Sequence, residues 1–433
     1  MNQDVRLQWQ RLEKVNTEVY PDSFSHVVWP NPFNTAQELP FPEPQAVAEP
    51  CMLYGDNLIW MNTLLQEGKA GSIDLIYIDP PYMSDVSYNS VLEKEAEQFR
   101  RPAFSDRWER GMPAYLNMLF PRLVRMRELL SPQGSLFIHL DWHASHYVKV
   151  LLDELFGYQN FVNEIVWCYG GGSRARRRFQ RKHDLIFWYA RGKNYTFNPQ
   201  YRPYTPATRE RGLTQVKGDK YKLREEGAMM QDWWTDIPKI LSPTAYENLK
   251  YPTQKPKDLL TRIIRSASNE GDLVADFYAG SGTTAEACEE LERRWLLCDN
   301  SPIALQTASY RQLRKKTSAF KIIRPQPYEK AAKSSIQAKK IKNNTMMEIE
   351  IQNYTPPEGE TEQNPESVID YWELDPCYDG KTFQSRWQLI RSKKNLQEPL
   401  PLKIQIPIEN SHQVAVVVHD IYGKSVLCCC RVE

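Results

Sequence analysis

Short apolar runs alternate with amphipathic stretches from about residue 54 to residue 312. The apolar runs predict buried strands at 73–78, 135–140, 161–169, 184–189, 273–277 and 295–299. Apolar residues at helical spacing predict helices at 113–130, 144–155, 257–267 and 283–291. Buried strands that alternate with helices are typical of a parallel sheet with helices on both faces. The pattern therefore predicts an α/β fold.

Two later stretches depart from this pattern. Residues 192–250 are polar and interrupted by five prolines, which predicts an insertion over one edge of the core. After residue 324 the chain is rich in Lys, Ser, Gln and Asn, and Pro-Pro-Glu-Gly-Glu follows at 356–360. That composition predicts a flexible linker. Apolar runs return from 368, with strand candidates at 404–408 and 414–418, so a small β domain is expected at the end.

The composition is that of an ordinary globular protein and does not indicate a binding partner. Net charge is +1 and 41% of residues are hydrophobic, as in ordinary globular proteins. No apolar run reaches the roughly 18 residues of a membrane span, and the polar start lacks the apolar region of a signal peptide. The eight cysteines show no metal-ligand spacing, so no metal site is expected. This cysteine usage favours a reduced, cytoplasmic setting.

One short segment concentrates positive charge. Residues 173–182 read SRARRRFQRK and lie between two predicted core strands. A solvated face is the ordinary explanation of such a run, but its position between core strands favours contact with DNA phosphates. The predicted DNA-binding residues are Arg174, Arg176, Arg177, Arg178, Arg181 and Lys182. Arg176–Arg178 are also candidates to fill the gap that an extruded base leaves.

A glycine-rich turn follows the strand predicted at 273–277. It reads DFYAGSGTT from Asp276 to Thr284, and a helix is predicted to begin at Thr283. Glycines let the backbone approach a ligand closely, and a helix N-terminus offers free N–H groups. Asp299 ends the next strand, where an acid can reach the ribose of an adenosine-containing cofactor. These features indicate a nucleoside cofactor and leave open which one.

A second motif, DPPY, directly follows the strand predicted at 73–78. Its residues are Asp79, Pro80, Pro81 and Tyr82. Consecutive prolines remove two N–H donors and hold the turn rigid, so an Asp and a Pro carbonyl can accept both hydrogens of an aromatic amino group. The Tyr82 ring can stack on the base that carries this group. Such hydrogen bonds localise the nitrogen lone pair for attack on a methyl group, although a surface turn would also explain the four residues alone.

Together the motifs resemble the amino-methyltransferases of prokaryotic restriction–modification systems, in the permuted order called the β class. The resemblance covers roughly residues 50 to 310 and is closest to the modification subunits of type III systems, most of which are longer. The matching segments, in order, are YGDNL at 54–58, IDLIYIDPPY at 73–82, FSDRW at 104–108, FGYQNF at 156–161, YPTQKP at 251–256 and AGSGTT at 279–284.

This resemblance implies a Rossmann-like methyltransferase sheet, S-adenosylmethionine as cofactor and double-stranded DNA as substrate. It implies that Asp79 and the Pro80 carbonyl accept from the target amine and that Tyr82 stacks on the flipped base. Asp56 would approach the cofactor's adenine, and Asp299 its ribose. The remaining implied cofactor residues are Thr253, Gln254 and Lys255 at the methionine end, and Asp276, Phe277, Tyr278, Gly280, Gly282 and Thr283 around the turn. At Tyr278 the family usually has Phe, and at Phe277 it usually has Pro or Phe. Both residues keep an aromatic wall.

The resemblance also assigns the segments of the chain. They are an N-terminal extension (1–50), a catalytic half (51–191), a target-recognition insertion (192–250), a cofactor-binding half (251–324), a linker (325–367) and a small β domain (368–433). Adenine N6 is favoured over cytosine N4 because cytosine enzymes more often carry Ser in place of Asp79. A silent DNA-binding subunit of a defence complex and an RNA methyltransferase are weaker alternatives. A restriction partner and a second copy of the chain are partners that the sequence leaves open.

Overall fold

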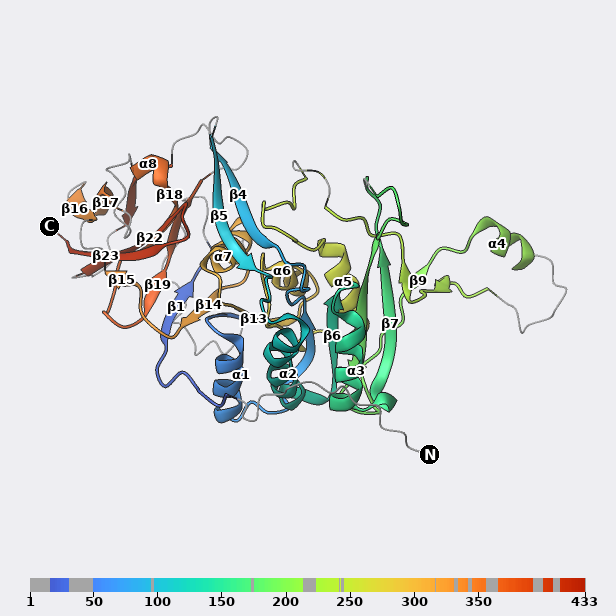
Figure 1. The fold of residues 1–433 in the computed structure, drawn as a ribbon. Helices are drawn as coiled ribbons and strands as arrows, with labels where there is room; N and C mark the ends of the chain where they lie inside the picture. Colours follow the sequence, from blue (N-terminus) through green and yellow to red (C-terminus); the bar gives the residue numbers. More distant parts are fainter. Residues whose placement is uncertain are drawn as a thin grey trace.

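The fold is built around an eleven-stranded sheet in the part of the chain that the computed structural model describes (Figure 1). In spatial order the strands are β11 (Trp233–Trp234), β7 (Phe161–Cys168), β8 (His183–Ala190), β6 (Leu130–Leu140), β3 (Ile73–Ile78), β12 (Leu273–Asp276), β13 (Arg294–Asp299), β2 (Cys51–Tyr54), β14 (Phe320–Arg324), β1 (Phe24–Val28) and β19 (Phe383–Ser385). Neighbours from β6 to β14 are parallel, whereas β8 runs antiparallel to both β6 and β7.

The structure describes most of the chain, with gaps. The described residues are 16–30, 50–94, 97–172, 175–212, 223–240, 242, 245–315, 317–330, 334–341, 345–355, 365–391, 400–407 and 413–432. Within these ranges, no helix combines the length and the hydropathy needed to span a membrane.

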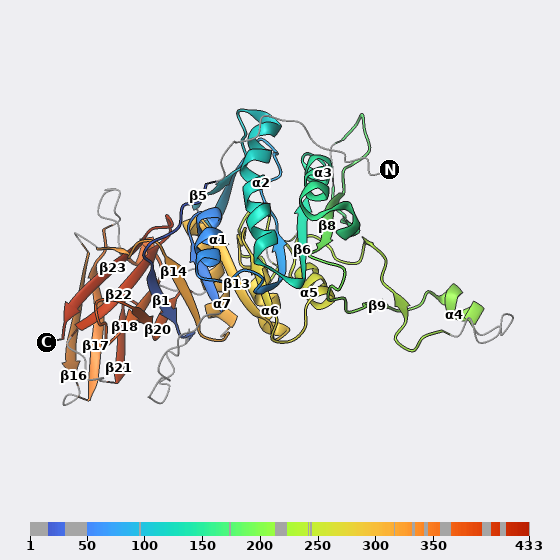
Figure 2. The ribbon, with the colours of Figure 1, turned by 90° about the horizontal axis from the view of Figure 1, so that it is seen from below.

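Helices cover both faces of the sheet because its central strands are apolar on both sides. On β3, Ile76 and Ile78 face one core cluster, and Leu75 and Tyr77 face the other. The first cluster is closed by α1 (Asn57–Gln66), α2 (Gly111–Leu129) and α3 (Ser145–Phe156). The second is closed by α5 (Lys257–Ala267), α6 (Thr283–Glu290) and α7 (Pro302–Lys315). Figure 2 shows the two helical layers on opposite sides of the strands, so the predicted α/β class is confirmed.

A long hairpin between β3 and α2 was not predicted. It consists of β4 (Ser87–Lys94) and β5 (Glu97–Ser105) and rises beside the C-terminal part of the chain in Figure 1. Its polar and charged residues hide the alternation that would mark a two-stranded ribbon. Near its base, the Ser90 hydroxyl donates to the Lys250 carbonyl at 3.1 Å.

The predicted insertion at 192–250 extends away from the sheet as an arm in Figure 1. It contains β9 (Tyr201–Arg202), α4 (Pro206–Gly212) and β10 (Ala228–Met229), and β9 pairs with β10. The arm returns through β11, which pairs with β7 at the edge of the central sheet. The insertion is therefore attached to the strand that leads into the basic segment.

The C-terminal part is a β sandwich, and it begins earlier than predicted. Its larger sheet has the order β15 (Glu329–Lys330), β23 (Ser425–Arg431), β22 (Gln413–Asp420), β18 (Ile369–Asp375), β20 (Trp387–Ile390). The short helix α8 (Pro365–Val368) precedes β18. The smaller sheet has the order β16 (Ser335–Ile341), β17 (Met346–Asn353), β21 (Lys403–Pro407), and side chains of both sheets share one core.

The predicted linker at 325–367 is therefore wrong where it contains the strands β15, β16 and β17. The apolar residues of β17, Met347, Ile349 and Ile351, are buried and alternate with polar ones. Such period-two spacing marks a strand with one solvated face. The Lys- and Gln-rich composition concealed it. Two further strands of the central sheet, β1 and β19, come from the predicted N-terminal extension and the predicted β domain.

Candidate active site

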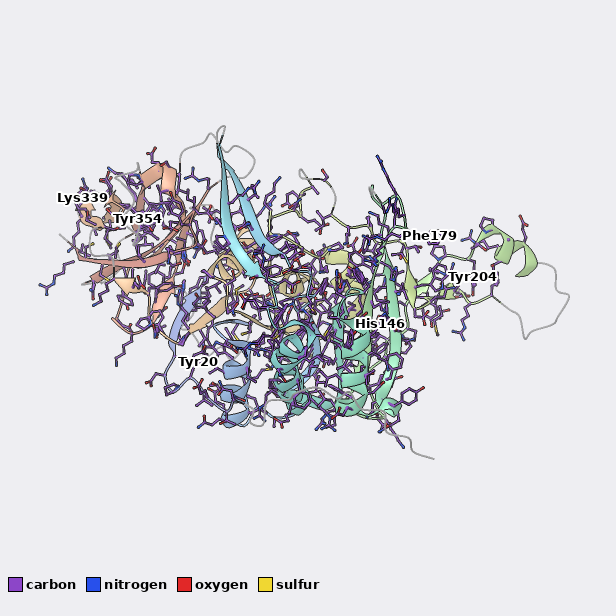
Figure 3. All side chains as sticks on the ribbon, viewed as in Figure 1. Tyr20, His146, Phe179, Tyr204, Lys339 and Tyr354 are labelled. Atoms are coloured by element: carbon purple, nitrogen blue, oxygen red, sulfur yellow. The ribbon has the colours of Figure 1, made fainter. Side chains whose placement is uncertain are left out.

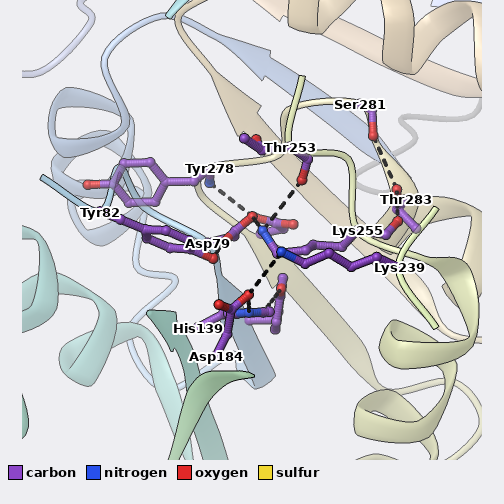
Figure 4. A network of polar contacts seen from close by, with 12 residues as sticks. Asp79, Tyr82, His139, Asp184, Lys239, Thr253, Lys255, Tyr278, Ser281 and Thr283 are labelled. Atoms are coloured by element: carbon purple, nitrogen blue, oxygen red, sulfur yellow. Dashed lines mark hydrogen bonds and ion pairs between the residues drawn. The ribbon is translucent and has the colours of Figure 1, made fainter. Parts of the chain in front are cut away.

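The two motifs meet at the carboxyl ends of adjacent strands. β3 pairs in parallel with β12, with Leu75 opposite Val274 and Ile76 opposite Ala275. Parallel neighbours end at the same edge, so the DPPY loop after β3 and the glycine-rich turn after β12 lie side by side. Both line one cavity of about 480 Å³. Ligands of open α/β sheets bind at such an edge, and Figure 4 shows the polar groups gathered there.

One buried carboxylate fixes the shape of the DPPY loop. Asp106 is 1% exposed, and its oxygens accept from three consecutive backbone N–H groups at Tyr82 (3.0 Å), Met83 (2.7 Å) and Ser84 (2.7 Å). The Ser84 hydroxyl (2.6 Å) and the Trp108 indole (3.0 Å) also donate to it. These bonds hold Met83 at φ 65°, a conformation that few non-glycine residues adopt. The FSDRW segment therefore positions the loop.

The Asp79 carboxylate is already held by two donors. Its Oδ1 accepts from the Tyr82 hydroxyl, and its Oδ2 forms an ion pair with the Lys255 ammonium. The Lys255 side chain is only 9% exposed, and its ammonium also donates to the Thr253 carbonyl at 3.4 Å. The resemblance assigned Lys255 to the cofactor's methionine end, whereas the structure places its charge on the Asp79 carboxylate. The cation presents Asp79 as an oriented hydrogen-bond acceptor.

Behind Tyr82 lies a buried histidine. The His139 and Tyr82 rings stack with centroids 6.0 Å apart and planes 25° apart. His139 Nε2 lies 3.2 Å from Asp184 Oδ2, and its Nδ1 lies 3.0 Å from the Tyr77 hydroxyl. These partners fit a neutral ring that donates from Nε2 and accepts at Nδ1. Burial lowers the pKa of His139, and the nearby Lys255 charge adds to this effect.

Asp184 links that histidine to the basic segment and to the insertion. Its Oδ1 accepts from the Tyr169 hydroxyl at 2.7 Å, and Lys239 Nζ lies 3.9 Å from its Oδ2. The Lys239 ammonium also lies 3.5 Å from the centre of the Tyr169 ring. Burial opposes ionisation of Asp184, but the hydrogen bond from His139 and the lysine charges outweigh it, and the pKa is lowered. The carboxylate is therefore charged at neutral pH.

The glycine-rich turn is organised around Asp276. Its Oδ1 accepts from the Tyr278 N–H at 3.0 Å and its Oδ2 from the Thr284 hydroxyl at 2.5 Å. Burial raises the pKa of Asp276 to about 7, although both hydrogen bonds lower it. Gly280 has φ 50°, and a Cβ there would lie 3.2 Å from the Tyr251 ring. Only glycine leaves the cavity open at this point.

Asp299 stands at the rim of the cavity with an acceptor set that suits a hydroxylated ligand. Its Oδ2 accepts from the Gly280 N–H at 2.8 Å and its Oδ1 from the Ser301 N–H at 2.9 Å. These two bonds fix the carboxylate and leave further lone pairs for donors such as ribose hydroxyls. Burial raises the pKa of Asp299, and the backbone donors counter part of that effect.

Asp56 lies at the far end of the cavity, where it caps α1. It accepts from the Leu58 N–H at 2.7 Å and forms a bidentate contact with Arg122 at 2.9 and 3.0 Å. Arg122 also donates to Asn57 at 2.6 Å, and Asn57 donates to the Phe277 carbonyl at 2.7 Å. This chain of contacts ties the start of α1 to the glycine-rich turn. Arg122 lines the cavity and was not predicted.

The other predicted cofactor residues divide into two groups. Thr253, Thr283, Phe277 and Tyr278 line the cavity. Gln254 also lies there, but its amide bonds the Glu247 carbonyl (2.6 Å) and the Leu249 N–H (3.0 Å), so it braces its own loop. Gly282 lies outside the lining residues and, with φ 72°, precedes α6 at a point where a Cβ would meet Ala308 at 2.7 Å. Its role in the structure is close packing.

The basic segment emerges from the same edge of the sheet, between β7 and β8. Arg176, Arg177 and Arg178 are exposed, and Phe179 beside them is 98% exposed (Figure 3). The Arg181 guanidinium lies 3.5 Å from the centre of the Trp142 ring, and Lys182 donates to the Gly172 carbonyl at 3.0 Å. Arg174 lies outside the described residues.

Several residues of the site escaped the sequence analysis. Asp106 was quoted as part of a matching segment without a role, and that segment was the available signal. His139 lies within the strand predicted at 135–140, where nothing in the local pattern marks it. Asp184 and Lys239 belong to no motif and are 55 positions apart, so only the tertiary structure brings them together.

Comparison with known proteins places this geometry in context. The family model described as DNA methylase matches residues 73–310. The type II methyltransferase M.EcaI of Enterobacter cloacae is 27% identical over 320 residues, which cover 60% of this chain and 68% of that protein. The DNA adenine methyltransferase YhdJ of Escherichia coli strain K12 is 27% identical over 249 residues, covering 57% and 76%. Among solved structures, the M1.HpyAVI–SAM complex is 21% identical with a TM-score of 0.40, covering 60% and 98%.

Proposed function

The chain belongs to the DNA methylase family, and from that premise we propose that it methylates the N6 amino group of adenine in double-stranded DNA. It is a DNA methyltransferase, and its methyl donor is S-adenosylmethionine. The observation that carries the adenine proposal is the Asp79 carboxylate, held ready by Lys255 in the cavity that the glycine-rich turn also lines.

The residues present fit the cofactor. S-adenosylmethionine supplies, when bound, an electrophilic methyl group on a positively charged sulfur. Asp299 offers fixed acceptor atoms for its ribose, and the bare Cα of Gly280 leaves room for it. Asp56 and the aromatic side chain of Tyr278 would hold its adenine, and Thr253 would lie near its methionine end.

The amine is activated by acceptors of this chain alone. Asp79 and the carbonyl of Pro80 accept the two N–H hydrogens of the target amine, which favours a tetrahedral nitrogen with a localised lone pair. The amine takes the place that the Lys255 ammonium holds on Asp79. Pro81 keeps the loop rigid, and Tyr82 stacks on the base from the side opposite His139. Asp79 accepts the proton that the nitrogen releases.

A base inside a duplex cannot reach this cavity, so the target adenine must be extruded, at a cost of a few kcal/mol. Exposed Arg176–Arg178 would contact phosphates beside it. The insertion at 192–250 would read the sequence, because specificity is often carried by loops on a rigid scaffold. Both assignments are supported by the position of these segments next to β7.

Adenine is preferred to cytosine because the catalytic loop begins with Asp79, where cytosine enzymes more often have Ser. YhdJ, a relative of this chain, is described as a DNA adenine methyltransferase. Cytosine N4 is the alternative, since it requires the same chemistry at an amino group. A catalytically silent DNA-binding subunit would be expected to carry a broken motif, and both motifs are intact.

Finer features of the proposal rest on the order of the motifs. DPPY precedes AGSGTT along the chain, which is the permuted order of the β class. Kinship with type III modification subunits, a restriction partner, a homodimer and a cytoplasmic setting stay predictions.

The test is methyl transfer by the purified chain. We expect labelled methyl groups from S-adenosylmethionine to enter duplex DNA, and sequencing of the modified DNA to show N6-methyladenine at a defined site. Asp79→Ala should abolish transfer, because the amine loses its acceptor, while cofactor binding persists. Asp22→Ala, at an exposed aspartate outside the cavity lining, is the control. Full activity of Asp79→Ala would refute the catalytic loop, and N4-methylcytosine in the product would refute adenine.

A further inference from the structure

Phe179 is an apolar side chain placed where water would disfavour it. Among the exposed large hydrophobic side chains of the described residues it is the most exposed, at 98%, with Tyr158 next at 74%. A single exposed apolar residue is common on protein surfaces. Its surroundings make Phe179 different, because it follows directly on three exposed arginines in the segment 175–182.

The charge around Phe179 suits a polyanion. Arg176, Arg177 and Arg178 are exposed, and within the described residues none of them forms an ion pair with a carboxylate. Two residues after Phe179, Arg181 packs on the Trp142 ring, which fixes the end of the segment. Guanidinium groups are the usual side-chain partners of DNA phosphates. When these arginines bind phosphates, the neighbouring Phe179 ring therefore lies at the surface of the duplex.

Both ends of the loop that carries Phe179 are tied to the wall of the base site. The Tyr169 N–H donates to the Lys182 carbonyl at 2.9 Å, and the Tyr169 hydroxyl donates to Asp184 at 2.7 Å. Asp184 in turn holds His139, which stacks on Tyr82; Figure 4 shows these three side chains together. Phe179 lies three positions before Lys182, a reach of at most about 10 Å.

We propose that Phe179 is a wedge that enters the base stack of duplex DNA where the target base leaves it. This inference rests on the proposed function. Apolar side chains of other DNA-binding proteins insert between base steps in this way. The Phe179 ring stacks on the neighbouring bases, and the arginines before it hold the phosphates. Because both ends of the loop are fixed, the gap that the target base leaves in the duplex lies beside the site where that base stacks on Tyr82.

Phe179 fits this role better than its neighbours do. The sequence alone pointed to Arg176–Arg178 as gap-filling residues, but a guanidinium must shed water to enter the stack. Trp142 is 41% exposed and packs against Arg181 and against His143, whose ring centroid lies 3.7 Å from its own. Within the part of the chain that the structure describes, the Phe179 ring makes no such contact. A Cβ added at Gly170 or Gly172, just before the loop, would meet no atom within 4 Å.

The experiment compares two duplexes that carry the mapped recognition site, one fully paired and one with an abasic site opposite the target base. The abasic duplex needs no wedge, because its target base is already unpaired. Phe179→Ala should lower kcat/KM on the paired duplex about 10- to 100-fold, the value of one aromatic–base stack, and change it less than about threefold on the abasic duplex. Phe179→Trp should retain activity on both.

Tyr158→Ala is the matched control, since Tyr158 is an exposed aromatic at the opposite end of β7. It should leave transfer to both duplexes unchanged. Equal activity of Phe179→Ala and wild type on the paired duplex would overturn the wedge, as would an equal loss on both duplexes. In either case wild-type transfer and the loss in Asp79→Ala would still support the proposed function. No transfer by the wild type to any DNA would overturn both.

Discussion

Buried histidine–carboxylate pairs occur in two regions of this molecule, at the wall of the active site and where the sandwich meets the central sheet. In the site network His139 lies between the Tyr77 hydroxyl and Asp184. In the junction network His26 of β1 lies between the Tyr328 hydroxyl, 2.7 Å from Nδ1, and Glu373, 3.0 Å from Nε2. Each histidine thus has a hydroxyl at Nδ1 and a carboxylate at Nε2.

The polar groups of the junction network contact one another. The other oxygen of Glu373 lies 2.8 Å from His419 Nε2, and His419 Nδ1 lies 2.8 Å from the Ser425 hydroxyl. Glu373 is 1% exposed, and although burial opposes its ionisation, the two histidines lower its pKa. β1 of the central sheet and β18 and β22 of the sandwich are joined through this one carboxylate.

The site network is open at both ends. His139 stacks on Tyr82, which lines the cavity, and Asp184 accepts from Tyr169 at the base of the basic loop. The same kind of histidine–carboxylate pair therefore has a different role in the site network and in the junction network. A network whose members all face each other joins two folded units, whereas one that ends on a cavity wall positions groups for a ligand. The neighbours at the ends of a buried pair decide its role, and the pair alone does not.

The largest effect is expected at the junction. Glu373→Ala removes the acceptor of two buried histidines and should lower the free energy of unfolding by about 3–5 kcal/mol, the usual result of removing one partner of a buried pair. Chemical denaturation measures it. Transfer per folded molecule should stay unchanged. Glu348→Ala, on the polar face of β17, where Glu348 pairs with Lys339 and Lys403, should have a much smaller effect. A large loss of transfer with full stability would contradict the assigned role of the junction network.

At the site the same kind of substitution should act on catalysis. Asp184→Ala releases His139 and the base of the loop, so the Tyr82 wall loses its support, and kcat/KM should fall about 100-fold, as for a small misplacement of a catalytic group. Cofactor binding should persist. Asp153→Ala is a matched control, because Asp153 holds the Tyr189 hydroxyl of the same strand at 2.6 Å outside the cavity lining. Equal methyl transfer by Asp184→Ala and Asp153→Ala would refute the claim that the site network acts on catalysis.

The smallest effect is a dependence on pH that both networks share. Burial lowers the pKa of His139 and of His419 in the folded chain, and the unfolded value is about 6.5. Below that pH the unfolded chain binds protons that the folded chain does not, so the stability that each neutral histidine provides is lost as pH falls. The slope is at most about 1.4 kcal/mol per pH unit and histidine.

Denaturation of the wild type, His139→Gln and His419→Gln between pH 7.5 and 5 measures this dependence. The advantage of the wild type over each variant should shrink as pH falls, because glutamine does not titrate. An advantage that grows toward acid would show the opposite sign and contradict the neutral state of the folded histidines.

The sequence predicted those parts of the fold whose pattern is local. Helix α5 begins and ends where its apolar spacing does, and β3 coincides with the run IDLIYI. The hairpin of β4 and β5 and the strands β16 and β17 were missed, because their polar composition resembles that of loops. Whether such residues form strands depends on the partner strand, which lies in a distant segment for β21 and β17.

Within the site, the sequence identified the residues whose spacing in the chain carries chemistry. Asp79, Tyr82, Asp276 and Asp299 follow strands of a recognisable order, and parallel strands bring their ends together for any sequence that folds this way. The ion pair of Lys255 with Asp79 and the links through Asp184 were out of reach, because they depend on side-chain distances between loops.

What the sequence determined by itself is the set of strands at the centre of the sheet, the two motifs at its edge and membership of a methyltransferase family. The tertiary structure alone decided that Lys255 neutralises Asp79, that Asp106 shapes the DPPY loop, and that one histidine pair lies at the site while another joins the sandwich. The reason is physical. Hydrophobic periodicity and turn residues act over a few positions of the chain, whereas a buried charge is stabilised by whichever groups the completed fold brings to within about 3 Å of it.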